Sequence, residues 1–245
     1  MVTWKDYFEA SKYQNMDETQ QEKGLPQPPL EMAYDPKAAL ISLPDPTSCS
    51  LVASDFLAIV ESRESRRKYT DEALSLVELS YLLWTTQGVK SVNETQTFTK
   101  RLVPSAGARH PFETYLLINR VEGIEPGLYR YLALEHKLLL VNAAEDINQK
   151  ITEASLKQKQ VQNSAVTFCW VADIARTYWR YNERSFRYIM LDAGHVCQNL
   201  YLAAETIHCG VCAIAAYDDD LMNNALGVDG EHQFTAYLAS LGKVI

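Results

Sequence analysis

The sequence predicts an α+β fold of interleaved helices and strands. Of its 245 residues, 47% are hydrophobic and 22% are charged, which is enough apolar material for a sizeable core and shows no bias towards disorder. Short apolar runs typical of strands alternate irregularly with segments of helical spacing, without a repeated βαβ order. The chain lacks the patterns G-x-G-x-x-G and G-x-x-x-x-G-K-[ST], which disfavours a dinucleotide-binding doubly wound sheet and a P-loop.

The first fifty residues predict an extended arm that wraps around the rest of the chain. Clusters of proline and polar residues at 24–29 and 44–46 interrupt this segment, and no apolar periodicity is sustained in it. We therefore divide the chain into an arm at residues 1–50 and one domain at residues 51–245.

Two helices are expected at the start of the domain. Ser54 is a suitable helix cap, and the apolar spacing after it predicts a helix that ends near Ser62. The second helix begins with the capping box formed by Ser75 and Glu78, and Gly88 provides its stop signal.

Three short strands follow. Apolar runs at residues 115–118, 128–131 and 138–141 are separated by turn-forming residues. A polar helical stretch is expected at 143–160, and a buried strand at 165–172.

A long core helix dominates the predicted second half, at about residues 182–207. A strand at 211–216, a short helix capped by Asp218 and a strand at 234–241 follow it. The apolar positions that recur near helical period along the long helix are Phe186, Ile189, Met190, Ala193, Cys197, Leu200 and Ala204.

Charge and cysteine usage restrict the partners and the compartment. The formal net charge of −8 argues against a general nucleic-acid or anionic-membrane surface, so any anion site must be local. Residues 1–10 have no apolar signal region, and no apolar run approaches the ~20 residues of a membrane span. Five cysteines, an odd number, favour a reducing cytoplasmic setting over a disulfide framework.

One candidate anion site stands out. Residues 63–69 place four basic side chains within seven positions of an acidic chain. Arg63, Ser65 and Arg67 alternate, so their donors could face one phosphate-bearing ligand. The alternative interpretation is a solvated basic turn after a helix.

A second segment, residues 101–113, suggests a planar ligand. Pro104 gives it a rigid start, and Ser105, Ala106 and Gly107 are small enough for backbone N–H groups to approach a ring closely.

Together these segments resemble the FMN-dependent nitroreductase superfamily and, within it, the SagB-type dehydrogenases, which include azoline oxidases of peptide biosynthesis. The resemblance runs from about Ser62 to Gly242. Its six ordered motifs lie at residues 62–69, 76–88, 104–113, 126–131, 192–200 and 215–220.

The resemblance implies a central mixed sheet flanked by helices, in a homodimer with FMN at the subunit interface. Arg63 and Ser65 would hold the phosphate and ribityl chain, and Arg67 would approach the N1/O2 edge of the flavin. The remaining cofactor-binding residues implied are Pro104, Ser105, Ala106 and Gly107 from the partner subunit, and Ala213, Ile214, Ala215 and Ala216 from the same chain as the arginines.

The chain departs from the family pattern at three places. Glu64 replaces a second arginine, and Lys243 is the one basic residue found after the last strand motif. Azoline oxidases carry a Lys-Tyr pair where this chain has Arg180 and Tyr181. An arginine cannot act as the general base that a lysine can, but it can orient a substrate or stabilise negative charge.

The predicted function is flavin-mediated hydride transfer on a small-molecule or peptide-derived substrate, with Arg180 and Tyr181 as the catalytic candidates. The residues leave open whether NAD(P)H is the reductant. The alternative is a flavin-free scaffold or partner subunit of a peptide-modifying complex, which a colourless purified protein would indicate.

Other chemical motifs have plainer explanations. Cys209 and Cys212 have the spacing of a redox dithiol, but they lie where a helix runs into a buried strand. His195 is expected to be a packed core histidine, and the Asp218–Asp220 run is expected to cap a helix, so no metal is assigned. Trp84, Trp170 and Trp179 are expected in the core or an interface, with Trp179 and Tyr181 the better placed to reach a substrate.

Overall fold

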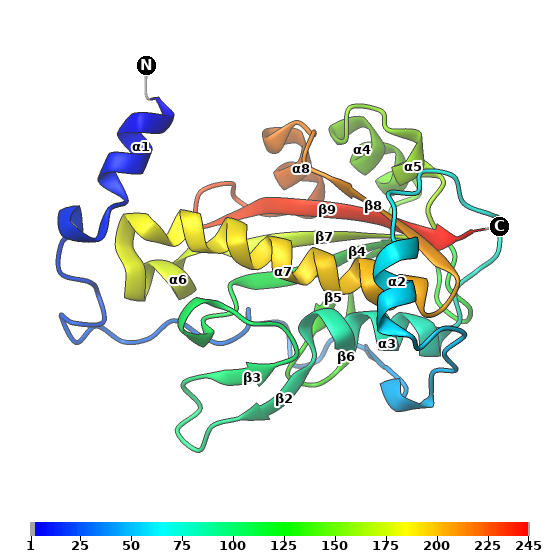
Figure 1. The fold of residues 1–245 in the computed structure, drawn as a ribbon, viewed down its shortest axis with the longest axis horizontal. Coiled ribbons are helices and arrows are strands. Elements are labelled where there is room, and N and C mark those ends of the chain that lie inside the picture. Colours follow the sequence, from blue (N-terminus) through cyan, green and yellow to red (C-terminus); the bar gives the residue numbers. More distant parts are fainter. Residues whose placement is uncertain (1–2, 245) are drawn as a thin grey trace.

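A seven-stranded sheet forms the centre of the protein, whose computed structural model describes residues 3–244 (Figure 1). The strand order is β1-β6-β5-β4-β7-β9-β8, and each of these neighbouring pairs is antiparallel. The α+β class is confirmed, although the sheet is antiparallel where a mixed one was expected. The strands are β1 (Leu40–Ser42), β4 (Phe112–Ile118), β5 (Gly127–Leu132), β6 (Lys137–Asn142), β7 (Val166–Asp173), β8 (Cys209–Ile214) and β9 (Gln233–Lys243).

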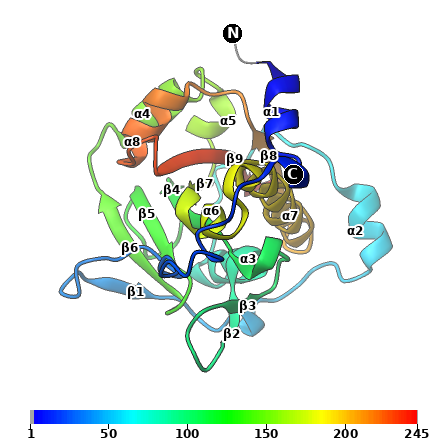
Figure 2. The ribbon, with the colours of Figure 1, turned by 90° about the vertical axis from the view of Figure 1, so that its left-hand side faces the viewer.

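Helices cover both faces of this sheet (Figure 2). On β7, side chains alternate between the faces, so Phe168 and Trp170 enter one core while Cys169 and Val171 enter the other. The first core is completed by α3 (Leu76–Gln87) and α7 (Ser185–Glu205), and the second by α4 (Ile147–Ala154) and α8 (Asp219–Leu226). None of the helices within residues 3–244 combines the length and apolarity that crossing a bilayer requires.

The predicted caps at Ser75 and Asp218 are confirmed, whereas the helix at residues 56–62 is capped by Asp55 and not by Ser54. The backbone N–H of Glu78 donates to Ser75 Oγ at 3.2 Å, and that of Ser75 donates to Glu78 Oε2 at 2.9 Å. The Asp218 side chain caps α8, which ends at Gly227 in the left-handed conformation with φ 74°.

Three predicted elements differ in the structure. The expected helix at 143–160 is split into α4 and α5 (Lys159–Gln162), because Leu156 and Lys157 have positive φ and cannot continue a right-handed helix. A separate helix, α6 (Ile174–Tyr181), precedes α7, and the reversal between them occurs at Asn182 with φ 43°. The hairpin of β2 (Val89–Val92) and β3 (Thr99–Arg101) was not predicted.

Residues 3–50 carry the short helix α1 (Trp4–Ala10) and strand β1, which pairs with β6 at the sheet edge. A buried ion cluster fastens the part of this segment near residue 32. Glu113 accepts a hydrogen bond from the backbone N–H of Met32 at 2.8 Å and pairs with the Arg176 guanidinium. Arg130 donates to the Met32 carbonyl at 3.0 Å. The helix α2 (Phe56–Ser62) then leads into the rest of the domain.

Candidate functional site

The segment of residues 63–67 lies flat against the edge strand β8. Ser65 forms a parallel bridge with Val211, and the backbone N–H of Arg66 donates to the Val211 carbonyl at 2.9 Å. This approach depends on Gly210, because a Cβ atom there would come within 2.7 Å of the Arg66 side chain. Edge-strand pairing therefore positions the predicted anion-binding side chains.

Tyr201, on α7, joins three of the predicted site residues. Its hydroxyl lies 2.9 Å from Ser65 Oγ and accepts a hydrogen bond from the backbone N–H of Ala213 at 2.9 Å. The Arg63 guanidinium lies 5.4 Å from the centre of the Tyr201 ring. Tyr201 was not singled out from the sequence, because it follows the matched motif of residues 192–200 and has the spacing of a core position.

Some charged side chains around this segment already have partners within the protein, and others do not. Glu64 pairs with Arg66 at 3.3 Å. Lys243 donates to Glu78 and to the Ile207 carbonyl, so its ammonium group is already bound. Within residues 3–244, Arg63 and Arg67 form no ion pair. Two guanidinium groups and the exposed Ser65 hydroxyl thus offer donors to an external anion.

Arg67 lies beside the Cys212 thiol. Burial raises the pKa of Cys212, and the neighbouring Arg67 guanidinium opposes that rise. Cys209 and Cys212 belong to the two different cores, because residues three apart on a strand point to opposite faces. Burial also raises the pKa of Cys209 to about 12. This placement disfavours a redox dithiol.

The loop of residues 104–107 is attached to the other half of α7. Asp192, which is buried, accepts hydrogen bonds from Ser105 Oγ at 2.6 Å and from the backbone N–H of Ala106 at 3.3 Å. Burial raises the Asp192 pKa, and the bond from Ser105 opposes the rise. Gly107 has φ 57°, and a Cβ atom there would lie 2.5 Å from the Tyr181 hydroxyl.

Arg180 and Tyr181 therefore lie beside this loop, at the end of α6. The Arg180 guanidinium is 5.8 Å from the Tyr181 ring centre, and the Tyr181 and Tyr188 rings meet edge to face at 4.7 Å. Both residues line a cavity of about 650 Å³, whose other side is formed by residues between Tyr13 and Glu22.

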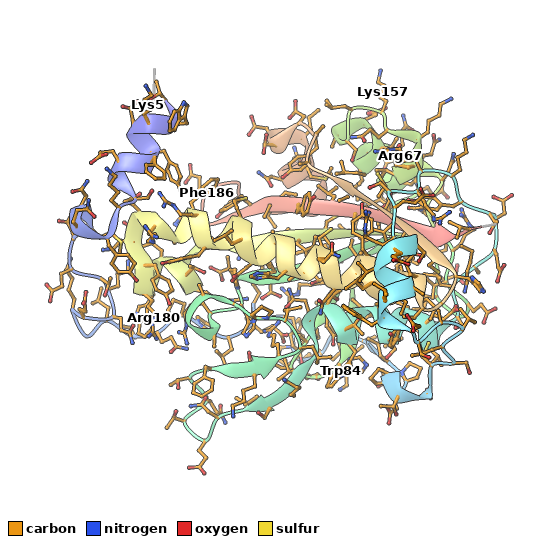
Figure 3. The ribbon with its side chains drawn as sticks, in the orientation of Figure 1. Lys5, Arg67, Trp84, Lys157, Arg180 and Phe186 are labelled. Carbon is orange, nitrogen blue, oxygen red and sulfur yellow. The ribbon has the colours of Figure 1, made fainter. Side chains whose placement is uncertain are left out.

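The predicted site residues thus form two separate groups in one chain. Tyr201 and Asp192, which hold the two groups, are nine residues apart on α7, or about 14 Å along the helix axis. Figure 3 places Arg67 and Arg180 towards opposite ends of this helix. Ala213 and Ile214 end strand β8 beside the arginines, and Ala215 and Ala216 are exposed just after it.

Two predictions for α7 are wrong. His195 is exposed and not a packed core residue, and Phe186 and Met190 face outwards with 45% and 37% of their surface accessible. Phe186 and Met190 share a helix face with the buried Ala193 and Cys197, but they lie in the first two turns of α7, whereas His195 lies on the opposite face. Trp170 and Trp179 are buried, and Trp84 is half-buried against His136.

His110 closes the loop and was not singled out from the sequence. Its backbone N–H donates to Ser105 Oγ at 2.9 Å, and its ring is buried. Burial lowers the pKa of His110 to about 3, and the nearby Arg101 acts in the same direction. The ring is therefore neutral at physiological pH.

The chain is similar to known proteins of one family. Residues 60–243 match the model of the nitroreductase family. The chain is 32% identical over 170 residues to the nitroreductase-family protein MJ1384 of Methanocaldococcus jannaschii, which covers 69% of this chain and 83% of that protein. It is 25% identical over 238 residues to the trifolitoxin-processing protein TfxB of Rhizobium leguminosarum bv. trifolii, which covers 93% of this chain and 64% of TfxB.

Solved structures show the same fold. A nitroreductase-family structure from Anabaena variabilis superposes with a TM-score of 0.71 at 26% identity, over 86% of this chain and 42% of that one. The Escherichia coli microcin synthetase complex McbBCD contains a chain that superposes with a TM-score of 0.61 at 18% identity, over 88% of this chain and 78% of that one. This chain therefore spans less than two thirds of TfxB and of the Anabaena protein.

Proposed function

Because this chain belongs to the nitroreductase family of oxidoreductases, we propose that it is an FMN-dependent enzyme of the SagB-type dehydrogenase branch. Bound FMN would supply flavin-mediated hydride transfer, and the protein would supply binding, orientation and electrostatic tuning. The observation that carries the proposal is the donor set of Arg63, Ser65 and Arg67 on the edge of β8, with both guanidinium groups free of ion pairs among residues 3–244.

The residues present fit the cofactor. Arg63 and Ser65 would hold the phosphate and ribityl chain, because a planar guanidinium and a hydroxyl match phosphate oxygens. Arg67 would approach the N1/O2 edge of the ring, where it stabilises negative charge. Residues 213–216 would line the ring from the same chain, next to the arginines.

A two-fold dimer would complete the site. Asp192, which holds the loop, and Tyr201, which holds the arginine side, are about 14 Å apart along the axis of α7. We therefore assign Pro104–Gly107 to the ring held by Arg63–Arg67 of the other subunit. If two α7 helices pair antiparallel about an axis near residue 196.5, the midpoint of 192 and 201, the partner subunit's loop comes level with these arginines along the helix axis.

The exposed surface of α7 supports this pairing. Leu191, Gly194, His195 and Gln198 are exposed, and Leu202 is half-buried. These five residues are centred on position 196.5 of the helix. In the antiparallel pair Leu191 would therefore meet the partner subunit's Leu202, and His195 would meet the partner subunit's Gln198. Gly194 leaves open space for close approach. The helix α2 adds Phe56, Leu57 and Val60, of which 69%, 65% and 42% is accessible.

We propose a small-molecule or peptide-derived substrate that reaches the ring beside Arg180 and Tyr181. The processing role in the name of TfxB and the microcin synthetase complex favour peptide chemistry. The Arg180 guanidinium would orient the substrate or stabilise negative charge, since it keeps its proton and cannot act as a general base. NAD(P)H is the proposed reductant to test first.

The proposal extends to the organisation of the chain. Residues 1–50 would act as an arm around an FMN-binding domain at residues 51–245. All five cysteines are free thiols, which accords with a cytoplasmic location.

The first experiment is a visible absorption spectrum of the purified protein, with FMN stoichiometry and sedimentation on the same sample. We expect a yellow dimer with two FMN molecules. A colourless protein that does not bind added FMN would instead favour the flavin-free scaffold or partner subunit, and a monomer with one FMN would contradict the shared site.

A mixed dimer tests the shared site directly. Arg63→Ala impairs the arginine half and Asp192→Ala the loop half, so either homodimer has two impaired sites. Co-expression of both chains should create one site with two defects and one intact site, and so restore FMN binding to about one site per mixed dimer. If the mixture binds no more FMN than the two homodimers do, both halves belong to one chain.

A further inference from the structure

We infer that Tyr201 is a positioning residue of the proposed flavin site. Its hydroxyl links Ser65, in the segment of residues 63–67, to Ala213 on strand β8 and orients the Ser65 side chain. The inference rests on the proposed function and adds a residue to it. Tyr201 touches no reacting atom. It acts through Ser65, Ala213 and Arg63, the three site residues with which it makes contact.

One of the two hydrogen bonds of the Tyr201 hydroxyl has a fixed direction, and in the other either hydroxyl can donate. The Ala213 backbone N–H can only donate, so the Tyr201 oxygen accepts from it at 2.9 Å. The single Tyr201 proton is then free to point at Ser65 Oγ, 2.9 Å away. With Tyr201 as the donor of this pair, Ser65 keeps its own proton for a ligand. The chain from Ala213 through Tyr201 to Ser65 thus ends in a donor that faces outwards, and each bond polarises the next.

The surroundings of Tyr201 make this arrangement rigid. The residue is 8% exposed and packs in the core beneath the site, whereas Ser65 is exposed. Its ring also lies against the Arg63 guanidinium, which fixes the second phosphate-directed donor. One side chain on the core helix therefore positions both donors assigned to the phosphate end of the ligand.

Two substitutions separate these contributions. Tyr201→Phe removes the hydroxyl and keeps the ring under Arg63, whereas Tyr201→Leu removes both. Tyr129→Phe is the control, because the Tyr129 hydroxyl likewise makes a 2.9 Å hydrogen bond, which it donates to the Glu125 carbonyl away from the candidate site. Ser65→Ala removes the outward-facing donor itself.

The measurement is the dissociation constant of FMN for the apoprotein, from quenching of flavin fluorescence, with the melting temperature of each apoprotein alongside. We expect Tyr201→Phe to weaken FMN binding about 10-fold, the equivalent of ~1.4 kcal/mol for one oriented hydrogen bond. Tyr201→Leu should weaken it further, and Tyr129→Phe should leave it unchanged. The visible spectrum of bound FMN should shift in Tyr201→Phe, because Ala213 borders the proposed ring site.

The double variant Tyr201→Phe with Ser65→Ala distinguishes positioning from a general loss of stability. If the hydroxyl acts through Ser65, the double variant should bind FMN about as weakly as Ser65→Ala alone. Fully additive losses, or equal affinity of Tyr201→Phe and the parent, would overturn the inference. If Tyr201→Phe binds FMN as tightly as the parent but Arg63→Ala loses FMN, only this inference is wrong and the proposed function is still supported. A parent that binds no FMN would overturn the proposed function and this inference together.

Discussion

The two ends of α7 hold their polar groups in opposite ways. At the Tyr201 end, Arg63, Ser65 and Arg67 are at least partly accessible, and their donors are largely uncommitted. At the Asp192 end, the Ser105 hydroxyl and the Ala106 N–H are both bound within the protein. A surface with free donors suits an anion, and one whose donors are already satisfied suits the face of a planar ring. The contrast supports assigning a different part of one ligand to each end.

The largest expected effects separate the two arginines. Arg63→Ala should weaken FMN binding roughly 10- to 150-fold, which corresponds to the ~1.5–3 kcal/mol of a charge-assisted hydrogen bond. The potential of the remaining bound flavin should hardly change, because a phosphate keeps its charge when the flavin is reduced. Equilibrium dialysis followed by a dye-linked redox titration measures both quantities.

Arg67→Ala should show the reverse pattern. A guanidinium at the N1/O2 edge stabilises the negative charge gained on two-electron reduction, so its loss should lower the potential by roughly 30–65 mV, if most of the ~1.5–3 kcal/mol differs between the redox states. Equal potentials in Arg67→Ala, Arg63→Ala and the parent would remove Arg67 from the ring edge. A drop confined to Arg63→Ala would exchange the two roles.

We expect a fall in pH to destabilise the folded protein through His110, in the loop at the Asp192 end of α7. His110 has a pKa of about 3 in the folded protein, below the ~6.5 of an unfolded histidine, so the unfolded state binds the proton more readily. Its contribution to stability is therefore complete above pH 6.5 and declines as the pH falls towards 3. Between pH 7 and pH 5 the loss should be about 2 kcal/mol, at 1.36 kcal/mol per pH unit.

His110→Gln tests this expectation, because glutamine has no titrating group. Denaturant unfolding of the variant and the parent at pH 7 and pH 5 should show a smaller pH-dependent loss in the variant. If the two proteins lose the same stability, the buried imidazole is not the group responsible.

The smallest effect is expected for the cysteines beneath the arginine segment. Cys209 and Cys212 face different cores, so replacing both by Ala should leave flavin reduction and reoxidation intact apart from some loss of stability. Stopped-flow traces of the double variant check this. Lost turnover with an unchanged flavin spectrum would restore the dithiol hypothesis.

The sequence predicted the features that depend on near neighbours. The capping box at Ser75 and Glu78 spans three residues, and the strands from residue 115 to 141 follow from local apolar runs. The outward face of α7 at His195 was missed because spacing alone does not reveal which of two stripes meets the sheet.

The residues that assemble the candidate site required tertiary contacts. Tyr201 meets Ser65 across 136 positions of the chain, and Asp192 meets Ser105 across 87. No local pattern encodes such pairs. The motifs indicated candidate binding residues, and the structure adds the two side chains of α7 that contact them.

The ion cluster under the arm affects how that segment could detach. Glu113 and Arg176 are fixed to each other on the sheet side, and the arm covers them with backbone groups near Pro29 and Met32. If the arm lifted away, the pair would stay together and gain hydration, which partly offsets the lost hydrogen bonds. Residues 30–33 should therefore exchange their amide protons through a local opening that leaves the central strands closed.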